Sequence, residues 1–183
     1  MNESEAGGKM TREEMAGAIS SATNEVFTTM LDLEISPGQI EGDSPTSSRA
    51  SGVIALLGLA GEWVGNGRVC CTPEFGCKMA SQLLMQPYTA VNEDVLDAIG
   101  EVANMIIGNV KNALEERLGT LSLSTPTVIY GHNFEARSVG VRERITISFN
   151  SGSEQLQVQL SISPATSKPA PRSLTHEAVP ALA

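Results

Sequence analysis

The stretch Asn92–Leu118, NEDVLDAIGEVANMIIGNVKNALEERL, decides the fold class. Its apolar residues recur at three- and four-residue spacing, which is the period of an α-helix with one buried side. Asn92 is a suitable N-cap and Gly119 follows the last apolar residue, so we predict a helix over 92–118. The predicted buried side comprises Ile99, Val102, Ala103, Ile106, Val110, Ala113 and Leu114. A helix with one apolar side has to pack on another layer, which we expect to be a sheet.

The opposite side of this helix is polar. Glu101, Asn104, Gly108 and Glu115 fall within about 40° of Asp97 around the helix axis. A solvated helix face is the plain interpretation of such a stripe. However, Asn and Gly are poor helix formers, with Gly up to about 1 kcal/mol worse than Ala, and Gly108 leaves bare backbone that another surface could approach. Two interpretations therefore stay open here, a solvated face and a functional one.

Glu101 and Asn104 lie one helical turn apart and together indicate a particular chemistry. An amide both donates and accepts hydrogen bonds, so it can hold a water molecule at a fixed angle of attack. A carboxylate one turn away can pair with a lysine on a partner and so align the two surfaces. No Ser/His or Cys/His pair is apparent that would supply a nucleophile. The pair suits hydrolysis of a phosphoryl group carried by another protein, where positioning supplies most of the rate.

The rest of the chain predicts two more helices and several strands. Thr11 and Glu14 form a capping-box pattern at the start of a helix that runs to about Leu33. Alternating or continuous apolar runs predict strands, and a stretch rich in Pro, Gly and Ser predicts a loop. We predict a loop over 36–49, a strand over 51–60, an interruption from Gly61 to Gly67, and a second strand over 68–72. A helix over 73–85 follows. Beyond the long helix we predict an edge strand over 121–130 that bends at Pro126, and a hairpin over 139–162 that turns at 150–153.

The order helix then strands occurs twice, over about 11–72 and 92–163. Superposing Glu25 on Glu101 places Thr28 opposite Asn104 and Ser21 opposite Asp97, so the two helices could be pseudo-symmetry mates. We predict one domain over 11–163, a disordered start over 1–10 and a disordered tail over 164–183 that is rich in Pro, Ala and Ser.

Composition excludes several classes of function. The net charge of −9 and the lack of a Lys/Arg cluster argue against a nucleic-acid partner. The best apolar run, Val53–Ala60, is too short to span a membrane, and the acidic N-terminus lacks the features of a signal peptide, so we expect a cytoplasmic protein. Cys70, Cys71 and Cys77 form no Cys-x-x-Cys pair, which favours reduced, buried or half-buried thiols over a metal site.

The motif Asp97-x3-Glu101-x2-Asn104, followed after 21 residues by Pro126, resembles the signature of the CheC/CheX/FliY phosphatases of bacterial chemotaxis. The segments 97–108, DAIGEVANMIIG, and 124–131, STPTVIYG, resemble CheX in particular. The resemblance covers the chain from about residue 11 to 163.

This resemblance implies an α+β fold, with a mostly antiparallel six-stranded sheet covered by helices in a pseudo-two-fold α-β-β-β repeat. It implies that the substrate is a phosphorylated CheY-like receiver domain. Glu101 would pair with the receiver's active-site lysine, Asn104 would orient the attacking water, and Asp97 and Gly108 would border the docking surface. Mg²⁺ would belong to the receiver, with no cofactor or metal in this chain.

Thr28 stands where a second amide would be, so the resemblance implies a single site and a CheX-like homodimer formed by sharing sheet. Two other functions remain open, a non-catalytic module that binds response regulators and a structural part of a flagellar switch.

Overall fold

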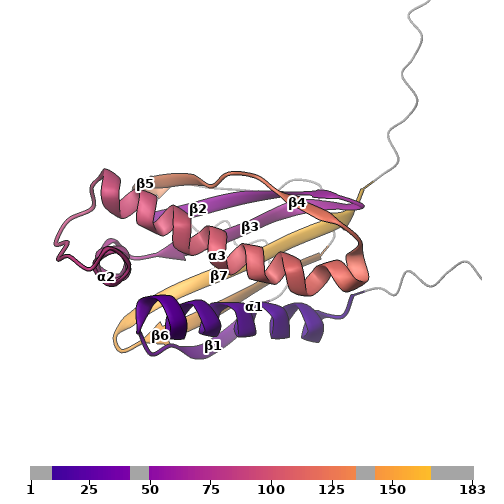
Figure 1. The fold of residues 1–183 in the computed structure, drawn as a ribbon, viewed down its shortest axis with the longest axis horizontal. Coiled ribbons are helices and arrows are strands. Elements are labelled where there is room, and N and C mark those ends of the chain that lie inside the picture. Colours follow the sequence, from indigo (N-terminus) through magenta and orange to yellow (C-terminus); the bar gives the residue numbers. More distant parts are fainter. Residues whose placement is uncertain (1–9, 42–49, 135–142, 166–183) are drawn as a thin grey trace, which may run out of the picture.

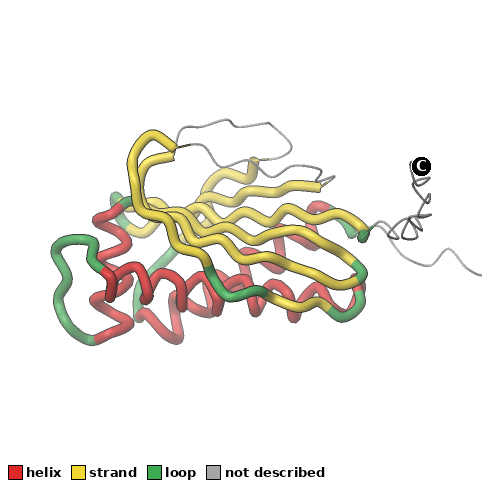
Figure 2. The backbone as a smooth tube through the Cα atoms, turned by 90° about the horizontal axis from the view of Figure 1, so that it is seen from above, coloured by secondary structure: helices red, strands yellow, loops and turns green. Residues whose placement is uncertain are grey.

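A computed structural model of the protein describes residues 10–41, 50–134 and 143–165. These residues form two layers, with three helices on one side of an antiparallel sheet (Figures 1 and 2). The helices are α1 (Arg12–Val26), which continues as the π-helix η1 (Phe27–Leu31), α2 (Pro73–Leu84) and α3 (Glu93–Leu118). The strands are β1 (Ser36–Glu41), β2 (Ala50–Gly61), β3 (Trp63–Cys71), β4 (Leu121–Leu123), β5 (Thr127–Phe134), β6 (Glu143–Ser151) and β7 (Glu154–Pro164).

The strand order is β1-β6-β7-β3-β2-β4, and β5 also pairs with β2. β4 and β5 both pair with β2 and together form one edge of the sheet. The sheet therefore has seven strands but is six strands wide, which is the predicted width. Ser124 closes the gap between the two edge strands, because its N–H donates to Gly58 O at 2.9 Å and its Oγ accepts from Gly58 N–H at 2.8 Å. The predicted bend at Pro126 is confirmed.

The sheet confirms the predicted pseudo-two-fold repeat. The first half of the chain contributes α1, β1, β2 and β3, and the second half contributes α3, the β4–β5 edge, β6 and β7. When each element is exchanged for its counterpart, the strand order is the same read from the other edge of the sheet. α1 and α3 run antiparallel, since Glu14 near the start of α1 contacts Arg117 near the end of α3 at 2.6 Å. Near the other end of α1, Glu25 accepts a hydrogen bond from Asn109 Nδ2 at 3.3 Å. The α+β class with antiparallel strands is confirmed.

The predicted helix starts are confirmed by their caps. Glu14 N–H donates to Thr11 Oγ1 at 3.2 Å and Thr11 N–H donates to Glu14 Oε2 at 2.9 Å, which completes the capping box. Asn92 Oδ1 accepts from Val95 N–H at 3.0 Å, and Thr72 Oγ1 accepts from Phe75 N–H at 3.1 Å. These side chains satisfy backbone donors that the first helical turn leaves free.

The loop predicted over 36–49 is wrong in its first part. Residues 36–41 form β1, an edge strand that pairs with β6 in the register Ser36 to Asn150 and Ile40 to Ile147. Pairing with a distant strand outweighs the local turn preference of this segment, as tertiary context often does. Residues 42–49 lie outside the described residues, as does the start of the last hairpin before residue 143. Of the predicted disordered ends 1–10 and 164–183, the structure describes three residues: Met10 is buried in the core, Pro164 ends β7, and Ala165 N–H donates to Glu62 O at 2.8 Å. Residues 1–9 and 166–183 lie outside the described residues.

The glycines over 61–67 were predicted to interrupt the strands, but β2 reaches Gly61 and β3 begins at Trp63. Gly67 lies within β3, where an added Cβ would come within 2.6 Å of Ile107 Cγ2. This glycine therefore lets α3 approach the sheet closely, which is a different use of Gly from a turn.

The core lies between the two layers. It includes Ile19 and Val26 from α1 and Val102 and Ile106 from α3, all fully buried. In the described part of the chain, no helix is both long and apolar enough to span a membrane.

Candidate functional site

The polar side of α3 faces away from the sheet, as predicted. Val102, Ala103 and Ile106 are buried under the helix, whereas Asp97 and Glu101 are exposed. Asn104 and Gly108 are half-buried on the same outer side, and we call these four residues (Asp97, Glu101, Asn104 and Gly108) the outward stripe. Ala113, predicted on the buried side, is exposed.

α3 packs closely on the β4–β5 edge at the turn that carries Glu101. A Cβ added at Gly100 would lie 3.3 Å from Val128 Cγ2 and 3.5 Å from Pro126 Cγ. The structure thus brings Pro126, the last residue of the sequence motif, against the helix turn that carries the carboxylate. A side chain at position 100 would make a tight contact with Val128, so the absence of a Cβ at Gly100 eases this close approach.

A second contact fixes the C-terminal half of α3. Lys111 Nζ donates to Leu121 O at 3.3 Å and to Glu115 Oε1 at 2.8 Å, while Glu115 Oε1 also accepts from Leu121 N–H at 2.8 Å. The hydrogen bonds from Lys111 and from Leu121 lower the pKa of Glu115. Glu115, which the projection placed near the outward stripe, is therefore engaged in holding α3 to β4. Asn104 lies between this contact and the Gly100 contact along the helix.

Glu101 and Asn104 are available to a partner. Neither side chain has a hydrogen bond or ion pair with any other described residue. A Cβ added at Gly108 would have no atom within 4 Å, so the backbone beside Asn104 is open on its outer side. The outward stripe therefore presents three features on one helix: the Glu101 carboxylate, the Asn104 amide and the open backbone at Gly108.

The corresponding side of α1 is arranged differently. Ser21, Glu25 and Thr28 are exposed. Glu25 already accepts from Asn109 Nδ2. Thr28 lies in η1, after the α-helix has changed to a π-helix, so its direction relative to Glu25 differs from that of Asn104 relative to Glu101.

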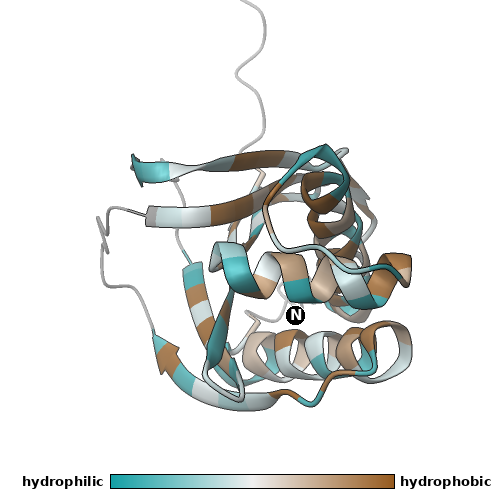
Figure 3. Ribbon diagram, turned by 90° about the vertical axis from the view of Figure 1, so that its left-hand side faces the viewer, coloured by the Kyte–Doolittle hydropathy of each residue, from teal (hydrophilic) through white to brown (hydrophobic). Residues whose placement is uncertain are grey.

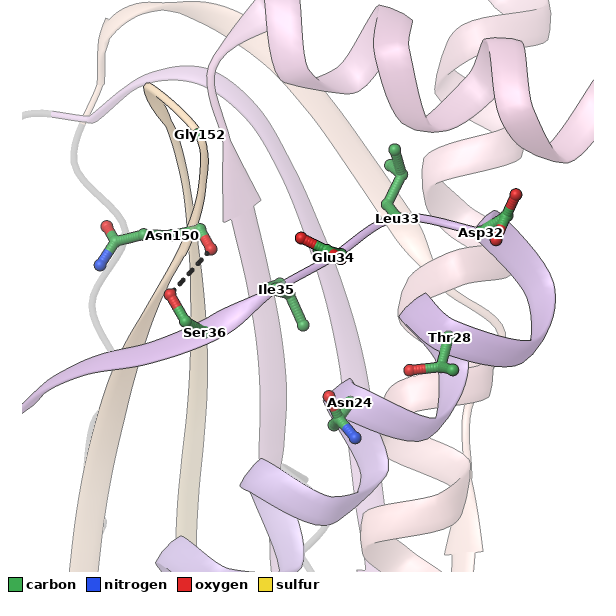
Figure 4. Close-up of a pocket in the computed structure, with 9 residues that line it drawn as sticks. All are labelled: Asn24, Thr28, Asp32, Leu33, Glu34, Ile35, Ser36, Asn150 and Gly152. Carbon is green, nitrogen blue, oxygen red and sulfur yellow. Dashed lines mark hydrogen bonds between the residues drawn. The ribbon is translucent and has the colours of Figure 1, made fainter.

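A cavity of about 570 Å³ lies beside α1 (Figure 4). Its walls come from α1, from the segment after η1 and from the β6–β7 turn, and Ser36 Oγ donates to Asn150 O at 3.3 Å across it. It is lined by Asn24, Thr28, Asp32, Leu33, Glu34, Ile35, Ser36, Asn150 and Gly152. Neither Glu101 nor Asn104 lines this cavity. The pair thus lies on an open face, which suits a macromolecular substrate. The cavity was not predicted, because its walls come from segments that are far apart in the sequence.

The three cysteines are free thiols, with Cys70 half-buried and Cys71 and Cys77 buried, as predicted. Arg68 Nε donates to Cys70 Sγ at 2.8 Å, yet burial still raises the pKa of Cys70. No group of three or more metal-ligating side chains occurs among the described residues.

Comparisons with known proteins agree on one family. The sequence model described as "Chemotaxis phosphatase CheX" matches residues 53–150. The CheY-P phosphatase CheX of Thermotoga maritima is 28% identical over 111 residues, which are 60% of this chain and 71% of that protein.

Two solved structures show the same fold. The chemotaxis protein CheX of Desulfovibrio desulfuricans has a TM-score of 0.74 and 28% identity, covering 82% of this chain and 99% of that one. The CheX-CheY-BeF3-Mg complex of Borrelia burgdorferi has a TM-score of 0.68 and 24% identity, covering 82% of this chain and 96% of that one.

Proposed function

Because the chain belongs to the CheX family of chemotaxis phosphatases, we propose that it hydrolyses the aspartyl phosphate of a phosphorylated CheY-like receiver domain. Glu101 and Asn104 carry this proposal, since they lie one turn apart and unpaired on the outward stripe of α3. The relative named a CheY-P phosphatase and the complex of a fold neighbour with CheY support the choice of substrate.

In this mechanism Asn104 holds the attacking water. The water oxygen forms a bond to phosphorus as the bond from phosphorus to the aspartyl oxygen breaks, which yields inorganic phosphate and a free aspartate. The water proton passes to the phosphate or to solvent. The amide contributes by fixing the position and direction of the water, because phosphoryl transfer depends mainly on positioning and electrostatics.

Glu101 has a docking role. Its exposed carboxylate pairs with the active-site lysine of the receiver and sets Asn104 against the phosphoryl group. Asp97 and Gly108 border the same surface, Asp97 as a second acidic group and Gly108 as the place where the receiver backbone comes close. Mg²⁺ belongs to the receiver in this scheme.

The experiment measures loss of acyl phosphate from purified phosphorylated CheY-like receivers, with and without this protein. We expect wild type to accelerate the loss, and Asn104→Ala to reduce the acceleration by about 100-fold while binding to the BeF3-treated receiver persists. Glu101→Ala should weaken both binding and turnover. Thr28→Ala on α1 is the matched control and should keep full activity.

A non-catalytic receiver-binding module or a flagellar-switch scaffold is the competing proposal. Docking alone requires no amide at position 104, which favours catalysis. Binding of the receiver by wild type with no acceleration of dephosphorylation would establish the module instead, and an Asn104→Ala variant of full activity would overturn the mechanism.

We also propose that two copies associate by sharing sheet. Among the described strands, β5 pairs only with β2, and its residues Ile129 and Tyr130 are exposed at this edge. An unpaired edge strand with apolar side chains is suited to pairing with another chain. Light scattering at micromolar concentration should give twice the 19.3 kDa mass of one chain, and a monomer would contradict the proposal.

A further inference from the structure

The C-terminal end of α2 carries an unusual residue. Leu84 is 42% exposed and Met85 is 92% exposed, and we call these two residues the α2 tip. Met85 has φ 54° and ψ 36°, the left-handed conformation. A helix that ends in this conformation normally uses Gly, because any Cβ is strained there. Met85 thus combines backbone strain with an apolar side chain left in water.

The α2 tip and the outward stripe face the same side of the molecule. α2 begins at Pro73, just after β3 ends at Cys71, and it is seen end-on in Figure 1, so it runs away from the sheet. Figure 3 shows the apolar end of α2 projecting on the side that carries the helices. The outward stripe of α3 also faces away from the sheet, because the opposite side of α3 is buried.

Hydrogen bonds hold the connection between α2 and α3 in place. Tyr88 N–H donates to Ser81 Oγ at 2.9 Å, and Tyr88 OH donates to Asp94 Oδ2 at 3.1 Å. Gln86 Nε2 donates to the Tyr88 hydroxyl. Asp94 lies one turn before Asp97 on α3, so this connection ties the base of the α2 tip to the start of the outward stripe. The exposed methionine is thereby carried on an ordered support, which lowers the entropy cost of a contact.

We propose that the α2 tip is an apolar contact for the receiver domain that docks on the outward stripe. This inference rests on the proposed function. A receiver seated on Glu101 and Asn104 lies on the side of the molecule toward which the α2 tip projects, and in this proposal it extends over the start of α3 to cover Met85. Burial of the exposed Met85 side chain adds binding free energy. Met85 takes no part in the chemical step. The adjacent Glu93 and Asp94 and the net charge of −9 disfavour an anionic membrane surface as the occupant.

Met85→Gly and Met85→Asn test the proposal, because both residues tolerate the left-handed conformation and both remove the apolar side chain. We expect KM for the phosphorylated receiver to rise about tenfold with kcat unchanged, as for a contact that is equal in the ground and transition states. Tm should not fall, and Met85→Gly should raise it by about 2 °C as the strain is relieved. Ile40→Thr is the matched control, since Ile40 is 58% exposed on β1 at the opposite edge of the sheet from β5, and it should leave KM unchanged.

An unchanged KM in folded Met85→Gly, with wild type active, would overturn this inference and leave the proposed function standing. A wild type that accelerates no receiver would instead overturn the proposed function. Conversion of a dimer to a monomer by Met85→Gly would assign the α2 tip to self-association and also overturn the inference.

Discussion

α1 and α3 occupy equivalent places in the pseudo-two-fold fold, but at the two matched positions α3 has the unpaired carboxylate of Glu101 and the amide of Asn104, whereas α1 has the paired Glu25 and Thr28. Both helices bury apolar residues against the sheet, with Ile19 in α1 and Ile106 in α3 as examples. Their outer sides differ, because Glu25 is hydrogen-bonded to Asn109 and Thr28 carries no amide. The apolar sides are constrained by packing, whereas the outer sides are free to diverge. The repeat therefore preserves the fold on both helices and, in our proposal, the chemistry on one.

The strongest test of this comparison asks whether an amide placed on α1 can restore the activity lost from α3. We predict that the double variant Asn104→Ala/Thr28→Asn stays about 100-fold less active than wild type. The amide at position 28 would project from a π-helix, and Glu25 beside it is already paired with Asn109. Loss of acyl phosphate from the receiver is the measurement.

Thr28→Asn alone is the control and should match wild type. Recovery of activity in the double variant to within about tenfold of wild type would show that the two helices are interchangeable, and the single-site interpretation would then be wrong.

Local signals predicted most of the fold. The caps at Thr11 and Asn92 and the helical period required only neighbouring residues, and each predicted helix lies within two residues of its observed ends. β1 was missed because its formation depends on pairing with β6, more than a hundred residues away. The sequence predicts an interruption of the strands at Gly67, because only the folded structure places Ile107 against this residue.

The candidate site was predictable in a similar, partial way. The helical period placed Glu101 and Asn104 on the outer side of α3, and the structure has them there. The contact of Gly100 with Pro126 joins residues far apart in the sequence and could not be derived from the period. The roles of the carboxylate and the amide came from the family resemblance and remain predictions, because the fold by itself assigns no chemistry.

A smaller difference in KM is expected between variants of two glycines, one on each helix. Gly108 on α3 and Gly17 on α1 both have open space where a Cβ would lie. Gly108→Leu and Gly17→Leu should each keep or raise Tm, by up to about 2 °C, because Leu is the better helix former. Only Gly108→Leu should raise KM for the receiver, by about tenfold, since its side chain would block close approach at the outward stripe.

Equal KM values for the two leucine variants would place the docking surface elsewhere. A rise in KM for Gly17→Leu of the same size would instead extend the docking surface across α1.

The smallest expected effect is on the pH dependence of stability, through one carboxylate on each helix, Glu115 on α3 and Glu14 on α1. Hydrogen bonds from Lys111 and from Leu121 N–H lower the pKa of Glu115 below its ordinary value of 4.5. The N–H of Thr11 is the main cause that lowers the pKa of Glu14. A carboxylate whose pKa is lowered by folding adds stability above its unfolded pKa, and that stability is lost as the pH falls through the folded pKa.

Glu115→Gln should therefore lower Tm at about pH 7, and the gap from wild type should close as the pH falls below about 4.5. Glu14→Gln should lower Tm less, because Gln can still accept from Thr11 N–H in a capping box. Thermal denaturation at several pH values measures both gaps. A pH-independent gap for Glu115→Gln would mean that its packing, and not its charge, holds α3 to β4. Neither variant should change kcat, because both carboxylates lie outside the outward stripe.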